Sequence, residues 1–142
     1  MIYDEEDYEF QIGKGVLLKE GTDITIIATG LEVYESLIAA QMLAQDGINA
    51  EVIDIHTIKP IDRELLVSSV SKTKKAVTVE EHSVIGGLYG AVCEVLSAQA
   101  PAPVFGIGIN DCFGHSGAAK ELIHEFGLDA EGICESIKNW LK

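Results

Sequence analysis

The segment Gly21-Thr-Asp-Ile-Thr-Ile-Ile-Ala-Thr-Gly30 decides the fold class of this chain. Residues 23–28 within it form a β-branched apolar run, which predicts a buried strand because strands covered on both faces are apolar throughout. Gly30 supplies the turn after this strand. A helix that ends at Gly47 is then predicted from an apolar stripe at helical spacing, at Val33, Leu37, Ala40 and Ala44.

The succession of strand, turn and helix recurs along the rest of the chain, which is typical of a parallel α/β sheet. Asp62 is expected to cap the second helix, and Gly86-Gly87 to lead into the third. The further predicted strands cover residues 50–55, 75–79 and 104–109, and the last two helices begin near Ala118 and at Asp129.

Ahead of the first long strand, residues 10–15 and 16–18 predict a small β segment at the edge of the sheet, and Gly21 supplies the turn after it. We therefore expect a three-layer αβα fold with a mostly parallel open sheet of about five strands. The predicted division places a linker and edge β segment in residues 1–15 and one α/β domain in residues 16–142.

The charge of the chain excludes several classes of partner. Ten basic and twenty-three acidic residues give a net charge of −13, which repels nucleic acid phosphates and anionic lipids. No apolar run approaches the roughly 18 to 20 residues of a membrane span. Cys93, Cys112 and Cys134 are odd in number and far apart, which predicts reduced thiols in a cytoplasmic protein and no zinc site.

In an open parallel sheet, the loops after the carboxyl ends of the strands lie at the same end of the sheet, where ligands usually bind. We call this end of the sheet, formed by the loops after the strands, the rim. The candidate ligand or interface residues on the rim are His56, Lys59, Glu80, His82, Asp111 and His115. His82 with Glu80 would suit acid–base chemistry, since a carboxylate can orient an imidazole. Hydrogen-bonded packing explains the same pair, because structural networks also collect His and Glu.

The signals for other chemistries are weak. Gly86-Gly-Leu-Tyr-Gly90 lacks the spacing of a dinucleotide-binding turn, and the neighbouring glutamates would repel a phosphate. His115 and His124 are nine positions apart, without the spacing of metal ligands. Ser116 lacks the flanking glycines of a nucleophile elbow, and a helix N-cap explains it. The residues themselves therefore predict no catalytic, cofactor-binding or metal-binding site.

Segments along nearly the whole chain resemble the C-terminal domain of transketolases. The matching segments are Gly21–Gly30 with Glu32-Val33, Asp54-Ile-His-Thr-Ile-Lys-Pro-Ile-Asp62, Val77–His82 with Gly86-Gly87, and Phe113-Gly-His-Ser-Gly117 with Phe126-Gly-Leu-Asp129. His56 stands where the family usually has an arginine. An anion contact made by that arginine is not carried over, because a neutral imidazole cannot supply the guanidinium fork.

The resemblance implies a parent enzyme of the pentose phosphate pathway that transfers a two-carbon ketol unit between sugar phosphates, with thiamine diphosphate and magnesium. In the family, a Gly-Asp-Gly motif of the N-terminal domain holds the diphosphate, and a glutamate of the middle domain activates the pyrimidine ring. This sequence contains no Gly-Asp-Gly, so we expect neither a cofactor site nor activity in the chain alone. The implied partners are other transketolase domains or an N-terminal subunit, and a second copy in a homodimer.

Two alternatives stay open. The first lies within the superfamily, because 1-deoxyxylulose-5-phosphate synthases and the beta subunits of 2-oxo acid dehydrogenases carry related domains. The second belongs to another class, a regulatory module that binds a small ligand at the rim. For that module, small anions or nucleotides are expected to raise the melting temperature by mass action.

Overall fold

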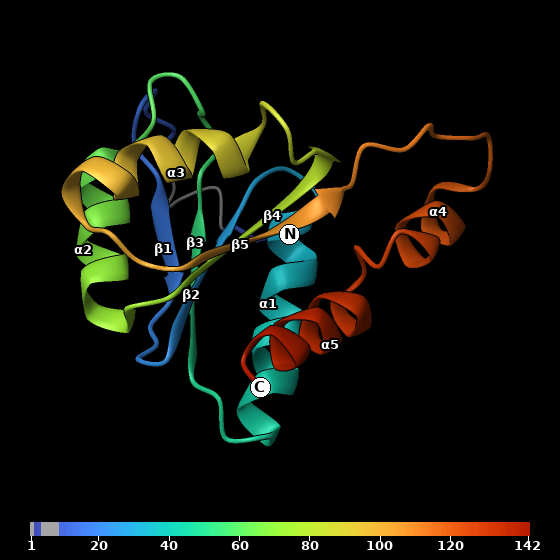
Figure 1. Ribbon diagram of the computed structural model, residues 1–142, viewed down its shortest axis with the longest axis horizontal. Coiled ribbons are helices and arrows are strands. Elements are labelled where there is room, and N and C mark those ends of the chain that lie inside the picture. Colours follow the sequence, from blue (N-terminus) through green and yellow to red (C-terminus); the bar gives the residue numbers. More distant parts are fainter. Residues whose placement is uncertain (1, 4–8) are drawn as a thin grey trace.

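Among the described residues, 2–3 and 9–142 of a computed structural model, five strands form one sheet in the order β1-β3-β2-β4-β5 (Figure 1). β1 runs antiparallel to β3, and the other neighbouring strands are parallel. The strands are β1 (Val16–Lys19), β2 (Ile24–Ala28), β3 (Ala50–Asp54), β4 (Ala76–Ser83) and β5 (Val104–Ile109). The helices are α1 (Glu32–Gln45), α2 (Arg63–Thr73), α3 (Leu88–Gln99), α4 (Ala119–Glu125) and α5 (Ala130–Trp140).

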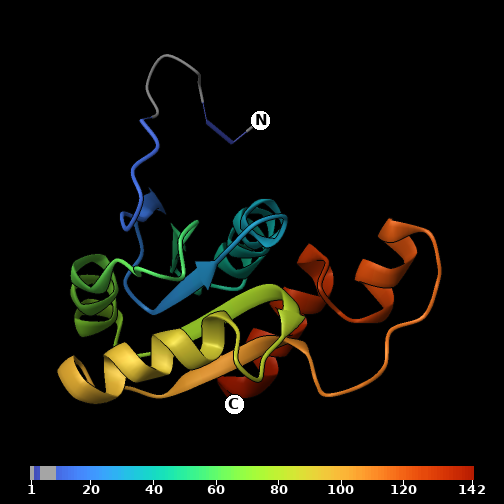
Figure 2. The same ribbon diagram turned by 90° about the horizontal axis from the view of Figure 1, so that it is seen from above.

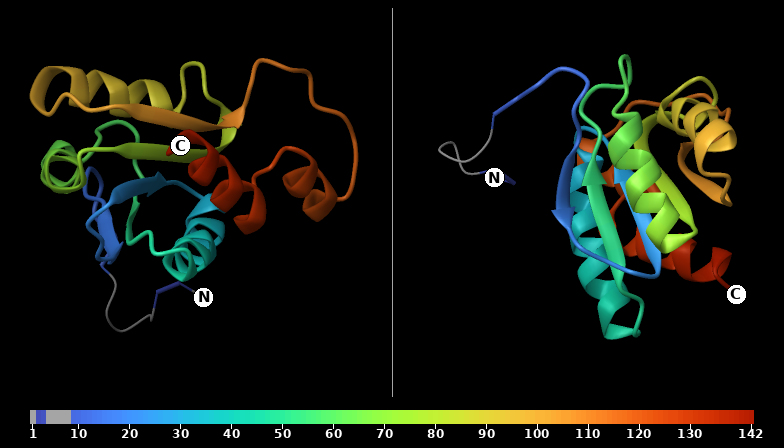
Figure 3. Two further views of the ribbon diagram at one scale, coloured as in Figure 1. Left: turned by 60° about the horizontal axis from the view of Figure 1, so that its bottom comes forward. Right: turned by 90° about the vertical axis from the view of Figure 1, so that its left-hand side faces the viewer.

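Helices cover both faces of the sheet and form the predicted three layers (Figure 3). α1 and α5 lie on one face, where Leu43, Ile133 and Ile26 of β2 belong to one buried cluster. α2 and α3 lie on the other face, where Leu66 and Leu96 belong to a second buried cluster. This arrangement explains why β2 is buried at every position, and it confirms the predicted α/β fold.

Two predicted helix caps are present. The Asp62 side chain accepts a hydrogen bond from the Leu65 N–H at 3.1 Å, and the Asp129 side chain accepts one from the Gly132 N–H at 2.9 Å. Each carboxylate satisfies an N–H group that has no partner inside the helix. The predicted cap at Ser116 is wrong, because the residue before α4 is Ala118 and no side chain caps this helix.

Several predicted boundaries need correction. The edge strand lies at Val16–Lys19, and residues 10–15 contain no strand. β4 extends four residues past Val79 to Ser83, because it pairs with Ile109 of β5 beyond a register shift. Ala44 is exposed, since the apolar stripe of α1 follows Ala40 and Leu43 instead.

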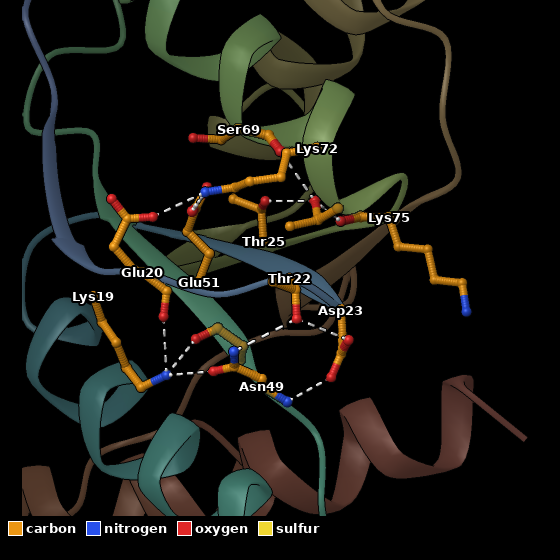
Figure 4. Close-up of polar contacts among 12 residues, drawn as sticks. Lys19, Glu20, Thr22, Asp23, Thr25, Asn49, Glu51, Ser69, Lys72 and Lys75 are labelled. Carbon is orange, nitrogen blue, oxygen red and sulfur yellow. Dashed lines mark hydrogen bonds and ion pairs between the residues drawn. The ribbon is translucent and has the colours of Figure 1, made fainter.

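Buried polar groups cluster at the end of the sheet opposite the rim (Figure 4). The Glu51 side chain is fully buried on β3, and its carboxylate forms a short ion pair with Lys72 near the end of α2. Lys72 also pairs with Glu20 at 3.1 Å. Hydrogen bonds to these two carboxylates raise the pKa of Lys72 above its ordinary value, with the bond to Glu51 the larger cause. This network compensates the burial of Glu51, and we assign it a structural role.

An arm extends from the end of β5 away from the rest of the molecule (Figure 2). We define the arm as residues 110–127, which comprise an extended loop and α4. α4 has no buried residue, and the Phe113 side chain is fully exposed at 101%. The chain then returns to the sheet at α5, whose Ile133 and Ile137 are buried.

Candidate functional site

The main candidate site is a cavity of about 390 Å³ at the rim, between the ends of β2 and β4. The chain crosses from one side of β2 to the other at this point, because α1 leads to β3 and α2 leads to β4. Such a switch in strand order opens the crevice in which doubly wound proteins usually bind ligands. The lining residues are Thr29, Gly30, Leu31, Ile58, Glu80, Glu81, His82, Gly86 and Gly87.

Glu80 occupies the position that a ligand's anionic group takes in many proteins of this architecture. Its side chain is buried, and its two carboxylate oxygens accept hydrogen bonds from the N–H groups of Leu88 at 2.7 Å and Tyr89 at 2.9 Å. A carboxylate in this place satisfies the first turn of α3 and interacts favourably with the helix dipole. Gly87 makes the approach possible, because an added Cβ would lie 2.0 Å from Glu80 Oε2.

His82 lies on the same side of β4 as Glu80, as the alternation of a strand predicts. Its Nδ1 is 3.9 Å from Glu80 Oε2 and 2.8 Å from the Ser83 carbonyl oxygen. The imidazole is two-thirds exposed, whereas Glu80 directs its oxygens at the α3 backbone. This geometry favours the interpretation of the pair as hydrogen-bonded packing over acid–base catalysis.

His56 and Lys59 lie outside this cavity. The His56 Nε2 is 3.3 Å from the Gln11 carbonyl oxygen, and its ring lies 4.7 Å from the Phe10 ring, so His56 contacts the segment ahead of β1. The Asp54 Oδ2 atom lies 3.8 Å from Nδ1 of the same imidazole. Lys59 lines a separate cavity of about 360 Å³ between the loop after β3 and α3.

Asp111 and His115 lie on the arm. Asp111 is exposed and adopts a left-handed backbone conformation with φ 43°. His115 Nε2 is 3.1 Å from Glu125 Oε2 across the two ends of the arm, and both side chains are more than half exposed. The structure therefore brings Glu80 and His82 together and distributes the other four candidates over three different places.

The most unusual ionisable group at the rim is Glu32, which was not among the predicted rim residues. It is the first residue of α1, its side chain is fully buried, and neither carboxylate oxygen has a hydrogen-bond partner among the described residues. Burial, followed by the charges of Glu35, Glu81 and Asp129, raises the pKa of Glu32 to about 7. An acidic residue soon after the Gly30 turn was the available signal in the sequence, but its burial depends on tertiary packing.

The rim does not fit thiamine diphosphate. The anion-binding N–H groups of α3 are already bonded to Glu80, and Glu81 adds a further negative charge beside the cavity. Among residues 2–3 and 9–142, no three His, Cys, Asp or Glu side chains converge in a way that could hold a metal ion. The described part of the chain also contains no helix that is long and apolar enough to cross a membrane.

Comparison with known proteins identifies the family. Residues 13–133 match the family described as transketolase, C-terminal domain. A 6-deoxy-6-sulfo-D-fructose transketolase subunit from Clostridium sp. is 48% identical over 92% of this chain. A 1-deoxy-D-xylulose-5-phosphate synthase from Syntrophotalea carbinolica is 40% identical over 92% of it.

A solved structure, described as a split gene transketolase in an inactive beta4 tetramer, shares the fold with a TM-score of 0.92. It is 46% identical and covers 98% of this chain. This chain spans 40% of the transketolase subunit, 21% of the synthase and 45% of the split-gene chain, so it corresponds to less than half of each. The chain belongs to the transketolase C-terminal domain family.

Proposed function

We propose that this chain is a non-catalytic assembly domain of a transketolase, whose parent enzyme transfers a two-carbon ketol unit between sugar phosphates with thiamine diphosphate and magnesium. The match of residues 13–133 to the C-terminal domain of that family carries this proposal. The proposed setting is the cytoplasm and the pentose phosphate pathway. The proposed partners are the cofactor-binding domains, in the same chain or in an N-terminal subunit, and a second copy.

The arm supports an assembly role. Phe113 is fully exposed on it, and α4 has no fully buried residue, with Ile123 its partly buried contact to the core. His115 lies 3.1 Å from Glu125 and so joins the loop of the arm to the end of α4.

The proposal is tested by mixing purified chains. Alone, this chain is expected neither to bind thiamine diphosphate in isothermal titration calorimetry nor to transfer ketol groups. Added to a chain that carries both cofactor-binding domains of the parent enzyme, it is expected to restore transfer. Phe113→Ser is expected to weaken the restoration, and Tyr34→Ser, which changes an exposed aromatic residue on α1, serves as the control. Activity of this chain alone would overturn the proposal.

The rim cavity favours a second candidate, a regulatory module that binds a small ligand. Its position at the switch in strand order is the observation that supports this candidate. Because Glu80 and Glu81 flank the cavity, a cationic or uncharged ligand suits it better than an anion. A thermal-shift screen separates the two functions, because a regulatory ligand raises the melting temperature by mass action. No shift with any amine or neutral ligand at millimolar concentration would exclude the module.

A further inference from the structure

The cavity that Lys59 lines differs in charge from the rim cavity beside it. It has a volume of about 360 Å³ and is lined by residues 58–61 of the loop after β3, by Arg63 of α2 and by three residues of α3. We call it the α2–α3 cavity. Ile58 lines both cavities, so the two are neighbours. A volume of this size is sufficient for a small organic molecule.

The lining of the α2–α3 cavity is mostly apolar and includes three charged side chains. Its apolar part includes Ile58, Ile61 and the buried Val95. The charged residues are Lys59, Arg63 and Glu94. Sites for small molecules commonly combine an apolar lining with a few polar groups that fix the orientation of the ligand. Two positive charges and one negative charge leave one positive charge in excess, although the chain as a whole has a net charge of −13.

The two cations of this cavity are not used within the domain. Lys59 and Arg63 form no ion pair or hydrogen bond through their side chains with any described residue. The acids next to them in the sequence have other partners, because Asp62 accepts hydrogen bonds from two backbone N–H groups and Glu64 pairs with Lys14 at 3.2 Å. Arg63 also begins α2, where the helix dipole disfavours a positive charge. Both cations therefore remain available to an anion.

Glu94 reaches the same cavity from α3. Within the described part of the chain its carboxylate pairs with neither Lys59 nor Arg63. A ligand with two negative charges would be repelled by this carboxylate, whereas one negative charge is compensated by the excess positive charge. The charges of the lining therefore favour an anion with a single charge.

The loop that carries Lys59 is held in place on the side of β1. The Gly13 N–H donates to Thr57 Oγ1 at 2.9 Å, and the Gly15 N–H donates to Asp62 Oδ2 at 3.0 Å. These two bonds fix the loop before and after Lys59. A cavity that exists before its ligand arrives binds with a smaller loss of conformational entropy.

We propose that the α2–α3 cavity binds a small organic carboxylate with one negative charge and an apolar body. The planar guanidinium of Arg63 matches the two oxygens of a carboxylate, and Lys59 adds a second positive charge. The apolar body of the ligand packs against Ile58, Ile61 and Val95. This site goes beyond the proposed assembly function, and it differs from the rim cavity, where two glutamates favour a cationic or uncharged ligand.

Titration of the purified full chain with hexanoate, followed by NMR of the backbone amides, tests the site. We expect saturable shifts at millimolar concentration in residues 58–63 and 91–95. Acetate is expected to bind more weakly because it has no apolar body, and inorganic phosphate because Glu94 repels its second charge. Hexylamine, which has the same apolar chain and the opposite charge, is expected to cause no shift in these residues.

Three variants of exposed residues separate binding from a general effect of charge. Arg63→Gln is expected to weaken hexanoate binding by about fivefold or more. Glu94→Gln is expected to strengthen it by roughly twofold or more, because it removes the repulsive carboxylate. Lys75→Gln removes an exposed positive charge outside the cavity and is expected to leave the affinity unchanged. The amide spectrum of each variant checks that the fold is kept.

Several results would overturn the inference. These are no saturable shift with hexanoate, shifts confined to the rim residues 80–87, equal binding of hexylamine, or a folded Arg63→Gln variant with the affinity of wild type. Equal weakening by Lys75→Gln, or weaker binding by Glu94→Gln, would also contradict it. The titration is done without the cofactor-binding chain. Restoration of ketol transfer therefore tests the proposed function separately, and either idea can fail while the other holds.

Discussion

Replacing Glu32 by glutamine is expected to make the stability of this domain less dependent on pH. Glu32 begins α1 with a fully buried side chain, and its carboxylate oxygens have no hydrogen-bond partner among the described residues. Burial is the main cause that raises its pKa from 4.5 to about 7. Folding therefore favours the protonated acid, and ionised Glu32 destabilises the native state.

The sign and size of the effect follow from linkage. The unfolded chain loses the Glu32 proton near pH 4.5 and the folded chain near pH 7, so folding at intermediate pH takes up a proton. The stability contributed by the protonated acid is fully present below pH 4.5 and is lost as the pH rises to about 7. One pKa unit corresponds to about 1.4 kcal/mol, so the loss between about pH 5 and pH 8 is roughly 2 to 3 kcal/mol.

Urea unfolding followed by circular dichroism measures this difference. Relative to wild type, Glu32→Gln is expected to gain roughly 2 to 3 kcal/mol more at about pH 8 than at about pH 5, because glutamine stays neutral. Glu121→Gln is the control, since Glu121 also lies in the first turn of a helix but is exposed. Its effect on stability is expected to be small, because the side chain is exposed to solvent.

One result would refute the reasoning about Glu32. If the stability difference between Glu32→Gln and wild type is the same at both pH values, the carboxyl does not change its ionisation on folding. In that case the native state must stabilise the charged form of Glu32 as well as water does.

Three further predictions concern single residues. Glu80→Ala is expected to destabilise the domain by about 1 to 3 kcal/mol in urea unfolding, because it leaves two N–H groups of α3 without their acceptor. Glu81→Ala, at an exposed position of the same strand, is the control and is expected to leave the stability unchanged. Gly21→Ala is expected to cost roughly 3 kcal/mol, because its Cβ would lie 2.1 Å from a backbone nitrogen of β3; a wild-type melting temperature would contradict this. The hydrogen bond that the His124 ring donates to the Asp129 carboxylate raises the pKa of His124. The stabilising contribution of this pair is therefore present below the unfolded pKa of His124 and is lost as the pH rises through the folded pKa. NMR titration of the His124 ring should show the raised pKa, and Asp129→Asn should abolish it.

The sequence predicts the elements of this fold well because each of them is specified locally. Residues 23–28 combine β-branched side chains with a following glycine turn, and the side chains of Asp62 and Asp129 cap helices that begin next to them in the chain. The ends of β4 and the position of β1 were predicted less accurately. Both depend on pairing with strands that lie far away in the sequence, namely β5 and β3.

The candidate site was predictable only in part. The alternation of a strand places Glu80 and His82 on one side of β4, as the structure shows. It does not reveal that Glu80 caps α3 eight residues later, because that contact depends on how tightly the loop at Gly87 turns. The wide separation of His56 from His115 follows from the course of the arm, which has no periodic pattern.

The sequence by itself determined the fold class and the family, because β-branched runs, glycine turns and the segments shared with transketolases are local properties of the chain. The tertiary structure alone decided that Glu32 is buried without a partner, that Glu80 fills the anion position at α3, and that β5 forms a free edge. Each of these depends on strand order and helix packing. These are set by which distant apolar surfaces cover one another, and no short stretch of sequence contains that information.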